Sequence, residues 1–173
     1  KQKTAYEIKE CDWSSDVCSS DLSPTITTGA PVTIPDHYVP DLNLRMQLYR
    51  RLSSLKTDED IEGFAAEMID RFGPLPDEVK LLTKLVSIKA LCLRAHVEKL
   101  EAGPKGVVVA FRDNSFANPQ GLVRYIAGQG AGARVRPDMR VVFPRDFDSV
   151  DERLEGARVI MRALVGIAEK KAA

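Results

Sequence analysis

Histidines, cysteines and paired carboxylates are the side chains best suited to chemistry, and in this chain they are few or scattered. His37 and His96 are the only histidines. His37 lies in a leader segment and His96 at a predicted helix–strand junction, so the two are not placed to share a metal ion. The sequence also has no phosphate-binding loop, nucleophile elbow, HExxH or CxxC motif. It therefore predicts no catalytic residues, no cofactor and no metal site.

The three cysteines do not form a site either. Cys11 and Cys18 belong to residues 1–22, KQKTAYEIKECDWSSDVCSSDL, whose two outer blocks resemble a translated sequencing adaptor. We therefore assign residues 1–22 as a non-native tail and exclude them from the fold. Only Cys92 remains, and a lone thiol within an apolar helical run is usually buried.

The charge balance limits the classes of partner. The chain has 25 basic and 25 acidic residues, of which three basic and five acidic ones lie in residues 1–22, so residues 23–173 carry a net charge of about +2. Such a balance does not favour strong binding to nucleic acid or to an anionic membrane. No apolar run approaches the roughly 20 residues that cross a bilayer. We expect a cytoplasmic module with no membrane partner.

Apolar spacing predicts three helices in the first half of the chain. They cover about Leu42–Leu52, a segment between an N-cap at Thr57 and Gly73, and about Pro76–Ala95. The third is apolar around most of its circumference, which is typical of a central helix. Before them, Ser23–Pro35 is rich in proline and threonine and predicts an extended linker or an edge strand.

The period changes to that of strands in the second half. Val97–Leu100 and Val107–Phe111 predict an antiparallel hairpin, and Arg134–Arg136 and Met139–Phe143 predict two more short strands. A short helix capped by Asn118 precedes the last two strands, and a long helix ends the chain. We therefore predict an α+β fold, with N-terminal helices packed on a small antiparallel sheet, a short helix and a long C-terminal helix.

The second predicted helix has an unusual outer face. Its polar cluster, roughly opposite the apolar residues, is Glu59, Asp60, Gly63, Glu67 and Asp70. Glu67 and Asp70 are like charges three residues apart, and Asp70 lies in the last turn, where the helix dipole disfavours an anion. A glycine within a helix costs about 1 kcal/mol relative to alanine. These choices indicate a docking surface for a basic partner, with an ordinary solvated face as the alternative.

Arginines form two further groups whose charge would suit nucleic acid. Aromatic side chains for base stacking are not interleaved with them, and aspartates lie close by. A solvated or salt-bridged face is therefore the simpler interpretation of both groups. The first is Arg45, Arg50 and Arg51, and the second is Arg134, Arg136 and Arg140.

The segment IPDHYVPDLNLRMQLYRRLSSLKTDEDIEGFAAEMIDRFGPLPDEVKLL resembles the C-terminal domain of the bacterial transcription-repair coupling factors. The likeness is strongest over Asp36–Leu82 and continues more loosely through VVVAF and NPQGL to the last helix. Members of this family are large ATP-driven DNA translocases that remove stalled RNA polymerase and recruit excision repair. The resemblance implies that this domain folds back on a module like the excision-repair B subunit, and masks the surface that recruits the A subunit until RNA polymerase is engaged.

For this chain, the resemblance implies an autoinhibitory regulatory domain over residues 36–173, joined through residues 23–35 to a translocase core. Carried over by position, Glu67 and Asp70 match the acidic face of the masking helix. ATP and magnesium, and contacts with DNA and RNA polymerase, would belong to other domains of the parent protein. We therefore expect no enzyme activity from this chain. A nucleic-acid-binding accessory module that uses the arginines of the first helix is the alternative.

Overall fold

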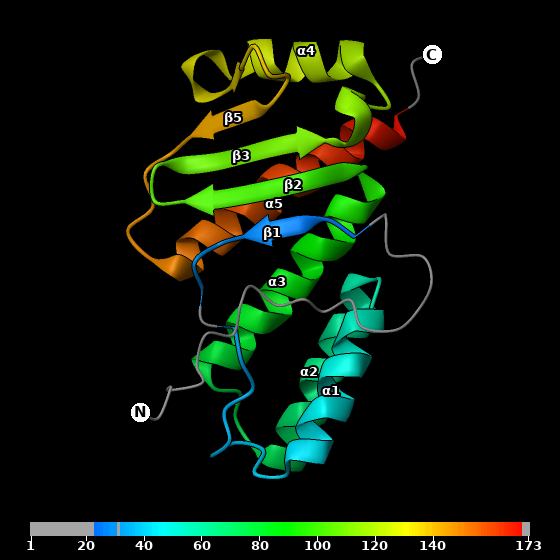
Figure 1. Ribbon diagram of the computed structural model, residues 1–173, viewed down its shortest axis with the longest axis vertical. Coiled ribbons are helices and arrows are strands. Elements are labelled where there is room, and N and C mark those ends of the chain that lie inside the picture. Colours follow the sequence, from blue (N-terminus) through cyan, green and yellow to red (C-terminus); the bar gives the residue numbers. More distant parts are fainter. Residues whose placement is uncertain (1–22, 31, 171–173) are drawn as a thin grey trace, which may run out of the picture.

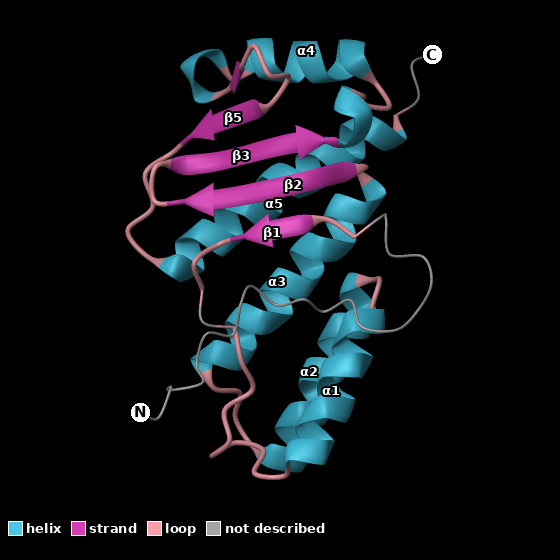
Figure 2. Ribbon diagram, in the orientation of Figure 1, coloured by secondary structure: helices cyan, strands magenta, loops and turns pink. Residues whose placement is uncertain are grey.

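The computed structural model describes residues 23–30 and 32–170, so residues 1–22, with Cys11 and Cys18, lie outside the described part of the chain. The described residues form five α-helices and a five-stranded sheet, which confirms the predicted α+β class (Figure 2). The strands are β1 Thr25–Thr27, β2 Val97–Gly103, β3 Gly106–Phe111, β4 Arg134–Val135 and β5 Val141–Pro144. The helices are α1 Leu42–Ser54, α2 Asp58–Phe72, α3 Asp77–Arg94, α4 Pro119–Gly128 and α5 Val150–Glu169.

The strand order is β1-β2-β3-β5-β4, and β2, β3, β5 and β4 pair antiparallel as predicted. β1 pairs parallel with β2, from Thr25 opposite Lys99 to Thr27 opposite Glu101. The sheet is therefore mixed, which corrects the prediction of a wholly antiparallel one. Three helices separate β1 from β2, and a long connection of this kind permits a parallel pair. We predicted either an extended linker or an edge strand for residues 23–35. Within this segment β1 is an edge strand of the sheet.

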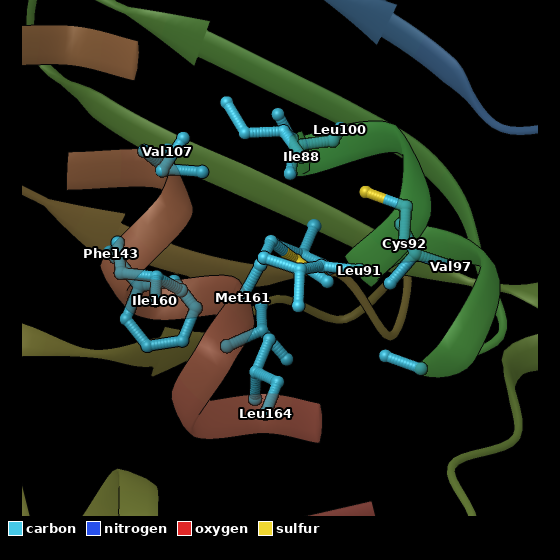
Figure 3. Close-up of a cluster of buried hydrophobic side chains, with 14 of the residues drawn as sticks. Ile88, Leu91, Cys92, Val97, Leu100, Val107, Phe143, Ile160, Met161 and Leu164 are labelled. Atoms are coloured by element: carbon cyan, nitrogen blue, oxygen red, sulfur yellow. The ribbon is translucent and has the colours of Figure 1, made fainter. Parts of the chain in front are cut away.

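One core lies behind the sheet. Figure 3 shows Ile88, Leu91 and Cys92 of α3 directed toward the strands and toward Met161 of α5. Every second residue of β3 is buried against these helices, as alternation along a strand requires. β2 shows the same alternation from Leu100 onward, after a register irregularity between Val97 and Lys99. The strand residues concerned are Val97, Leu100, Ala102, Val107, Val109, Phe111, Val141 and Phe143.

A second core lies around the first half of α3. There Val79, Leu82 and Val86 pack with buried residues of α1 and α2. Figure 1 shows α1 and α2 beside the lower half of α3, away from the sheet, whereas we predicted the N-terminal helices on the sheet. The physical reason is the length of α3, 18 residues or about 27 Å, which is enough to take part in two cores. Its apolar circumference thus confirms the prediction of a central helix.

Local contacts fix the position of α2. Thr57 and Asp60 form a complete capping box at its start. At its end the hydroxyl of Tyr38 lies 2.8 Å from the carbonyl oxygen of Gly73 and 3.1 Å from that of Met68. Tyr38 is buried in the second core, so the segment before α1 holds the C-terminal end of α2 in place.

The last two helices are joined by one buried side chain. Asn118 caps α4, as predicted, by accepting a hydrogen bond of 2.9 Å from the Gly121 N–H. Its amide nitrogen donates to the carbonyl oxygens of Ile167 and Lys170, at 3.2 and 2.7 Å, at the end of α5. A Cβ on Gly121 would lie 2.7 Å from Cγ2 of Ile167, so the NPQG sequence permits α4 and α5 to approach closely.

Candidate interaction surface

The outward side of α2 carries a row of four residues that we call the outer row. Glu59, Gly63, Ala66 and Asp70 follow one another at spacings of four, three and four residues, so they lie on one line along the helix. All four are exposed, whereas the opposite side of α2 is buried in the second core. The row is about 16 Å long, with a carboxylate at each end and two small residues between them.

The fold itself gives no reason for a glycine at position 63. A Cβ built there would meet no heavy atom within 4 Å, and Gly63 has an ordinary helical backbone. Alanine would fit and would stabilise the helix by about 1 kcal/mol. The absence of a side chain therefore serves no packing need within this domain, but it lets another backbone approach α2 closely.

The two carboxylates of the outer row lack a partner among the residues that the structure describes. Neither Glu59 nor Asp70 makes a hydrogen bond or ion pair through its side chain with residues 23–30 or 32–170. Glu59 lies in the first turn of α2, where an anion suits the helix dipole, and Asp70 in the last turn, where it does not. Asp70 is thus the carboxylate that a basic partner would stabilise most.

Glu67 has a different environment from that of Asp70. Its carboxylate lies 2.7 Å from Arg51 of α1 and 3.2 Å from Arg71. The hydrogen bond from Arg51, aided by Arg71, holds the pKa of Glu67 below its usual value. The two guanidinium groups also lie over aromatic rings, Arg51 over Phe64 at 5.6 Å and Arg71 over Phe72 at 5.1 Å. Glu67 therefore belongs to a cluster at the flank of the outer row.

The sequence pattern did not reveal this cluster or the opposite flank. The sequence places Arg51 in one group with Arg45 and Arg50, because the spacing along one helix does not show which side chains face another helix. On the other flank Ile69 is 49% exposed. The sequence could have indicated this flank, because Ile69 is an apolar residue outside the buried stripe of α2. Ile69 gives the surface an apolar contact beside its carboxylates.

A groove lined mainly by charged side chains, which we call the polar groove, lies between α2, α3 and α5. Asp58 accepts a hydrogen bond of 2.7 Å from Ser87 of α3 and pairs with Arg162 of α5, also at 2.7 Å. Nearby, Lys84 of α3 lies 2.5 Å from Asp151 of α5. These contacts fix the orientation of α2, and hence of the outer row, relative to the sheet.

The two histidines and Cys92 lie in different surroundings. His37 and His96 are exposed, and no three histidine, cysteine or acidic side chains within residues 23–30 and 32–170 could hold a metal ion. Burial raises the pKa of the Cys92 thiol to about 12, so it stays protonated and is a poor nucleophile. Among the same residues, no helix has the length and apolar character needed to cross a membrane.

The matching family model and the matching relatives point to the same protein family. The family model described as TRCF domain matches residues 28–122. The transcription-repair-coupling factor of Rickettsia bellii (strain RML369-C) is 41% identical over 120 residues, which are 69% of this chain and 11% of that protein. The factor of Escherichia coli (strain K12) is 33% identical over 134 residues, or 78% of this chain and 12% of that protein. This chain thus spans about a ninth of the length of these curated relatives.

The fold has a match among solved structures. The crystal structure of the C-terminal domain of a transcription-repair coupling factor superposes with a TM-score of 0.73. The match covers 87% of this chain and 96% of that one at 22% sequence identity, so it supports the fold alone. Because the family model covers more than half of the chain, and relatives of one name match in sequence, this chain belongs to the TRCF domain family of the transcription-repair coupling factors.

Proposed function

We propose that this domain is the autoinhibitory interaction domain of an ATP-dependent transcription-repair coupling factor. It docks through α2 on the excision-repair-B-like module of its parent protein and masks the surface that recruits the excision-repair A subunit. Engagement of RNA polymerase releases the domain. ATP, magnesium and DNA are bound by other domains of the parent, as the family resemblance implies.

The observation that carries the proposal is the unpaired outer row of α2. Asp70 and Glu59 offer free carboxylates to basic groups, Gly63 and Ala66 permit close approach, and Ile69 adds apolar contact. We assign the main electrostatic contact to Asp70. Glu67 contributes less because Arg51 and Arg71 already neutralise it.

The expected affinity is modest, which suits a reversible latch. Exposed ion pairs contribute only about 0–1 kcal/mol each. Covalent attachment within the parent raises the effective concentration of the domain to about millimolar for a short flexible linker. A weak contact can therefore stay closed within the parent, and binding of RNA polymerase can still open it.

The first test is a titration of this chain with the excision-repair-B-like module of the same parent protein. We expect weak binding that decreases as salt rises, because the contacts are electrostatic. Asp70→Lys should weaken binding about three- to tenfold, and Glu59→Lys should weaken it less. Calorimetry or fluorescence anisotropy at two salt concentrations gives these values.

Glu98→Lys is the matched control. Glu98 is an exposed carboxylate on β2, outside α2, and its side chain has no partner within the described residues. The control should bind like the unmodified chain. Equal losses for Asp70→Lys and Glu98→Lys would show a non-specific charge effect, and no loss for Asp70→Lys would move the docking surface away from α2.

A further inference from the structure

The two faces of the sheet differ in their coverage. The face toward α3 and α5 is buried in the first core. In Figures 1 and 2 these helices lie behind the strands, and no described helix lies in front of them. The residues on that front side, which we call the open sheet face, are half-buried by their neighbours or exposed. The strands of this face contribute their other side to the first core, whereas α2 packs in the second core.

Strand register identifies the residues of the open sheet face. Glu101 lies opposite Val108, Val108 opposite Val142, and Val142 opposite Arg134. Directly opposite residues on neighbouring strands share a face, so these four form one row across the sheet. A second row begins with Lys99 opposite Ala110. The rows form a narrow aliphatic strip with charged side chains at its ends.

Arginines dominate one edge of this strip. Arg140 lies two residues before Val142 and therefore faces the same side, and it pairs with Asp138 at 3.3 Å. Arg136 is two residues after Arg134, and its N–H donates to the Arg140 carbonyl oxygen at 2.8 Å. Neither Arg134 nor Arg136 forms an ion pair through its side chain with any described residue.

The charges across the strip are not balanced. The Lys99 ammonium lies 2.6 Å from the Glu101 carboxylate, so these two neutralise each other. The pKa of Glu101 is lowered, first by the hydrogen bond from Lys99 and also by the charges of Arg140 and Arg136. The arginines therefore exert their field across the open sheet face. Two guanidinium groups without an ion pair to any described residue, beside half-buried aliphatic side chains, fit a partner with carboxylates beside apolar residues.

We propose that the open sheet face is a second interaction surface, which binds an acidic amphipathic helix of a protein partner. The apolar stripe of that helix lies on Val108, Ala110 and Val142, and its carboxylates pair with Arg134 and Arg136. A helix is the element that normally covers the bare face of a sheet. Nucleic acid fits less well. The row from Glu101 to Arg134 and the row that begins with Lys99 and Ala110 carry no aromatic side chain on which bases could stack.

The test uses this chain labelled with nitrogen-15 and a designed peptide of leucine, alanine and glutamate. The peptide is an amphipathic helix of about 18 residues, or five turns. We expect amide shifts concentrated in β3, β4 and β5, and affinity that decreases as salt rises. Arg134→Glu/Arg136→Glu should weaken binding about tenfold or more, since two attractive contacts become repulsive.

Three controls decide the outcome. Arg45→Glu/Arg50→Glu on α1 changes the net charge by the same amount and should leave binding unchanged. A peptide with lysine in place of glutamate should not bind the face. Val142→Ser, which keeps the arginines, should weaken binding by removing apolar contact, and its amide spectrum reports whether the fold is intact.

Other results would overturn the proposal. They are shifts outside the sheet, equal losses from the two double reversals, or no binding of the glutamate peptide. If a single-stranded oligonucleotide shifted the same amides more strongly than the peptide, with a steeper salt dependence, the face would be a nucleic-acid site instead. None of these variants alters the outer row of α2, so this test is independent of the proposed latch.

Discussion

Glu67 and Asp70 are three residues apart on α2 but have different electrostatic surroundings. Glu67 is held by Arg51 and Arg71, whereas Asp70 has no partner within the described part of the chain. A charge reversal at Glu67 would place a cation beside two arginines and would disturb the contact between α1 and α2. Asp70 is therefore the position at which binding can be tested without a change in the domain's own ion pairs.

Gly63 allows stability and docking to be separated. We expect Gly63→Ala to raise the free energy of unfolding by about 1 kcal/mol, because the site has room for a methyl group and alanine favours the helix. Urea denaturation measures this change. Binding to the B-like module should weaken all the same, because the methyl group separates the two surfaces.

Gly166→Ala on α5 is the matched substitution for this prediction. A Cβ there also meets no atom within 4 Å, so the gain in stability should be similar and docking should be unaffected. If Gly63→Ala bound as tightly as the unmodified chain, close approach at Gly63 would not be part of the contact.

At the scale of the elements, α3 organises the molecule. Its first half packs with α1 and α2 and its second half with the sheet and α5. Ser87 and Lys84 of α3 also contribute to the polar groove, where Asp58 of α2 meets Arg162 of α5. The contacts of Asp58 in the groove thus connect α2 to both α3 and α5.

The groove predicts an acid dependence of stability. The hydrogen bond from Ser87, opposed by partial burial and aided by Arg162, lowers the pKa of Asp58 below its usual value. A lowered pKa stabilises the fold above the unfolded-state pKa of about 4, and this contribution is lost as pH falls through the folded-state pKa. Because the pair is partly exposed, we expect about 1 kcal/mol or less.

Asp58→Asn should therefore be less stable than the unmodified chain near pH 7, and this difference should disappear as pH falls through the lowered pKa of Asp58. Urea midpoints measured from neutral to acidic pH give the comparison. Asp148→Asn, which changes an exposed carboxylate outside the groove, is the control. A constant difference between Asp58→Asn and the unmodified chain at every pH would show that ionisation of Asp58 does not stabilise the fold.

The sequence was sufficient for the elements that local signals define. Thr57 and Asn118 cap the helices as predicted, and the apolar circumference of α3 correctly indicated a central helix. β1 has only a weak signal in the sequence, because a three-residue strand has almost no periodicity and depends on a partner far along the chain. The contact of Arg51 with Glu67 depends on how α1 packs on α2, which the pattern of a single helix does not contain.

At the scale of the whole molecule, the domain has two surfaces on different cores. The outer row of α2 is acidic, and the open sheet face is bordered by Arg134 and Arg136, which form no ion pair with any described residue. Surfaces of opposite charge favour different partners, so contact at one does not require release at the other. In the proposed latch the acidic surface is occupied in the closed parent protein.

The most direct test of the masking proposal is the affinity of the excision-repair A subunit for the parent protein in the absence of RNA polymerase. We predict about three- to tenfold tighter binding to a parent that carries Asp70→Lys, because a weaker latch leaves the recruitment surface open more often. Arg134→Glu/Arg136→Glu in the parent should leave the affinity unchanged. Equal affinity of the A subunit for the unmodified and Asp70→Lys parents would contradict masking through α2.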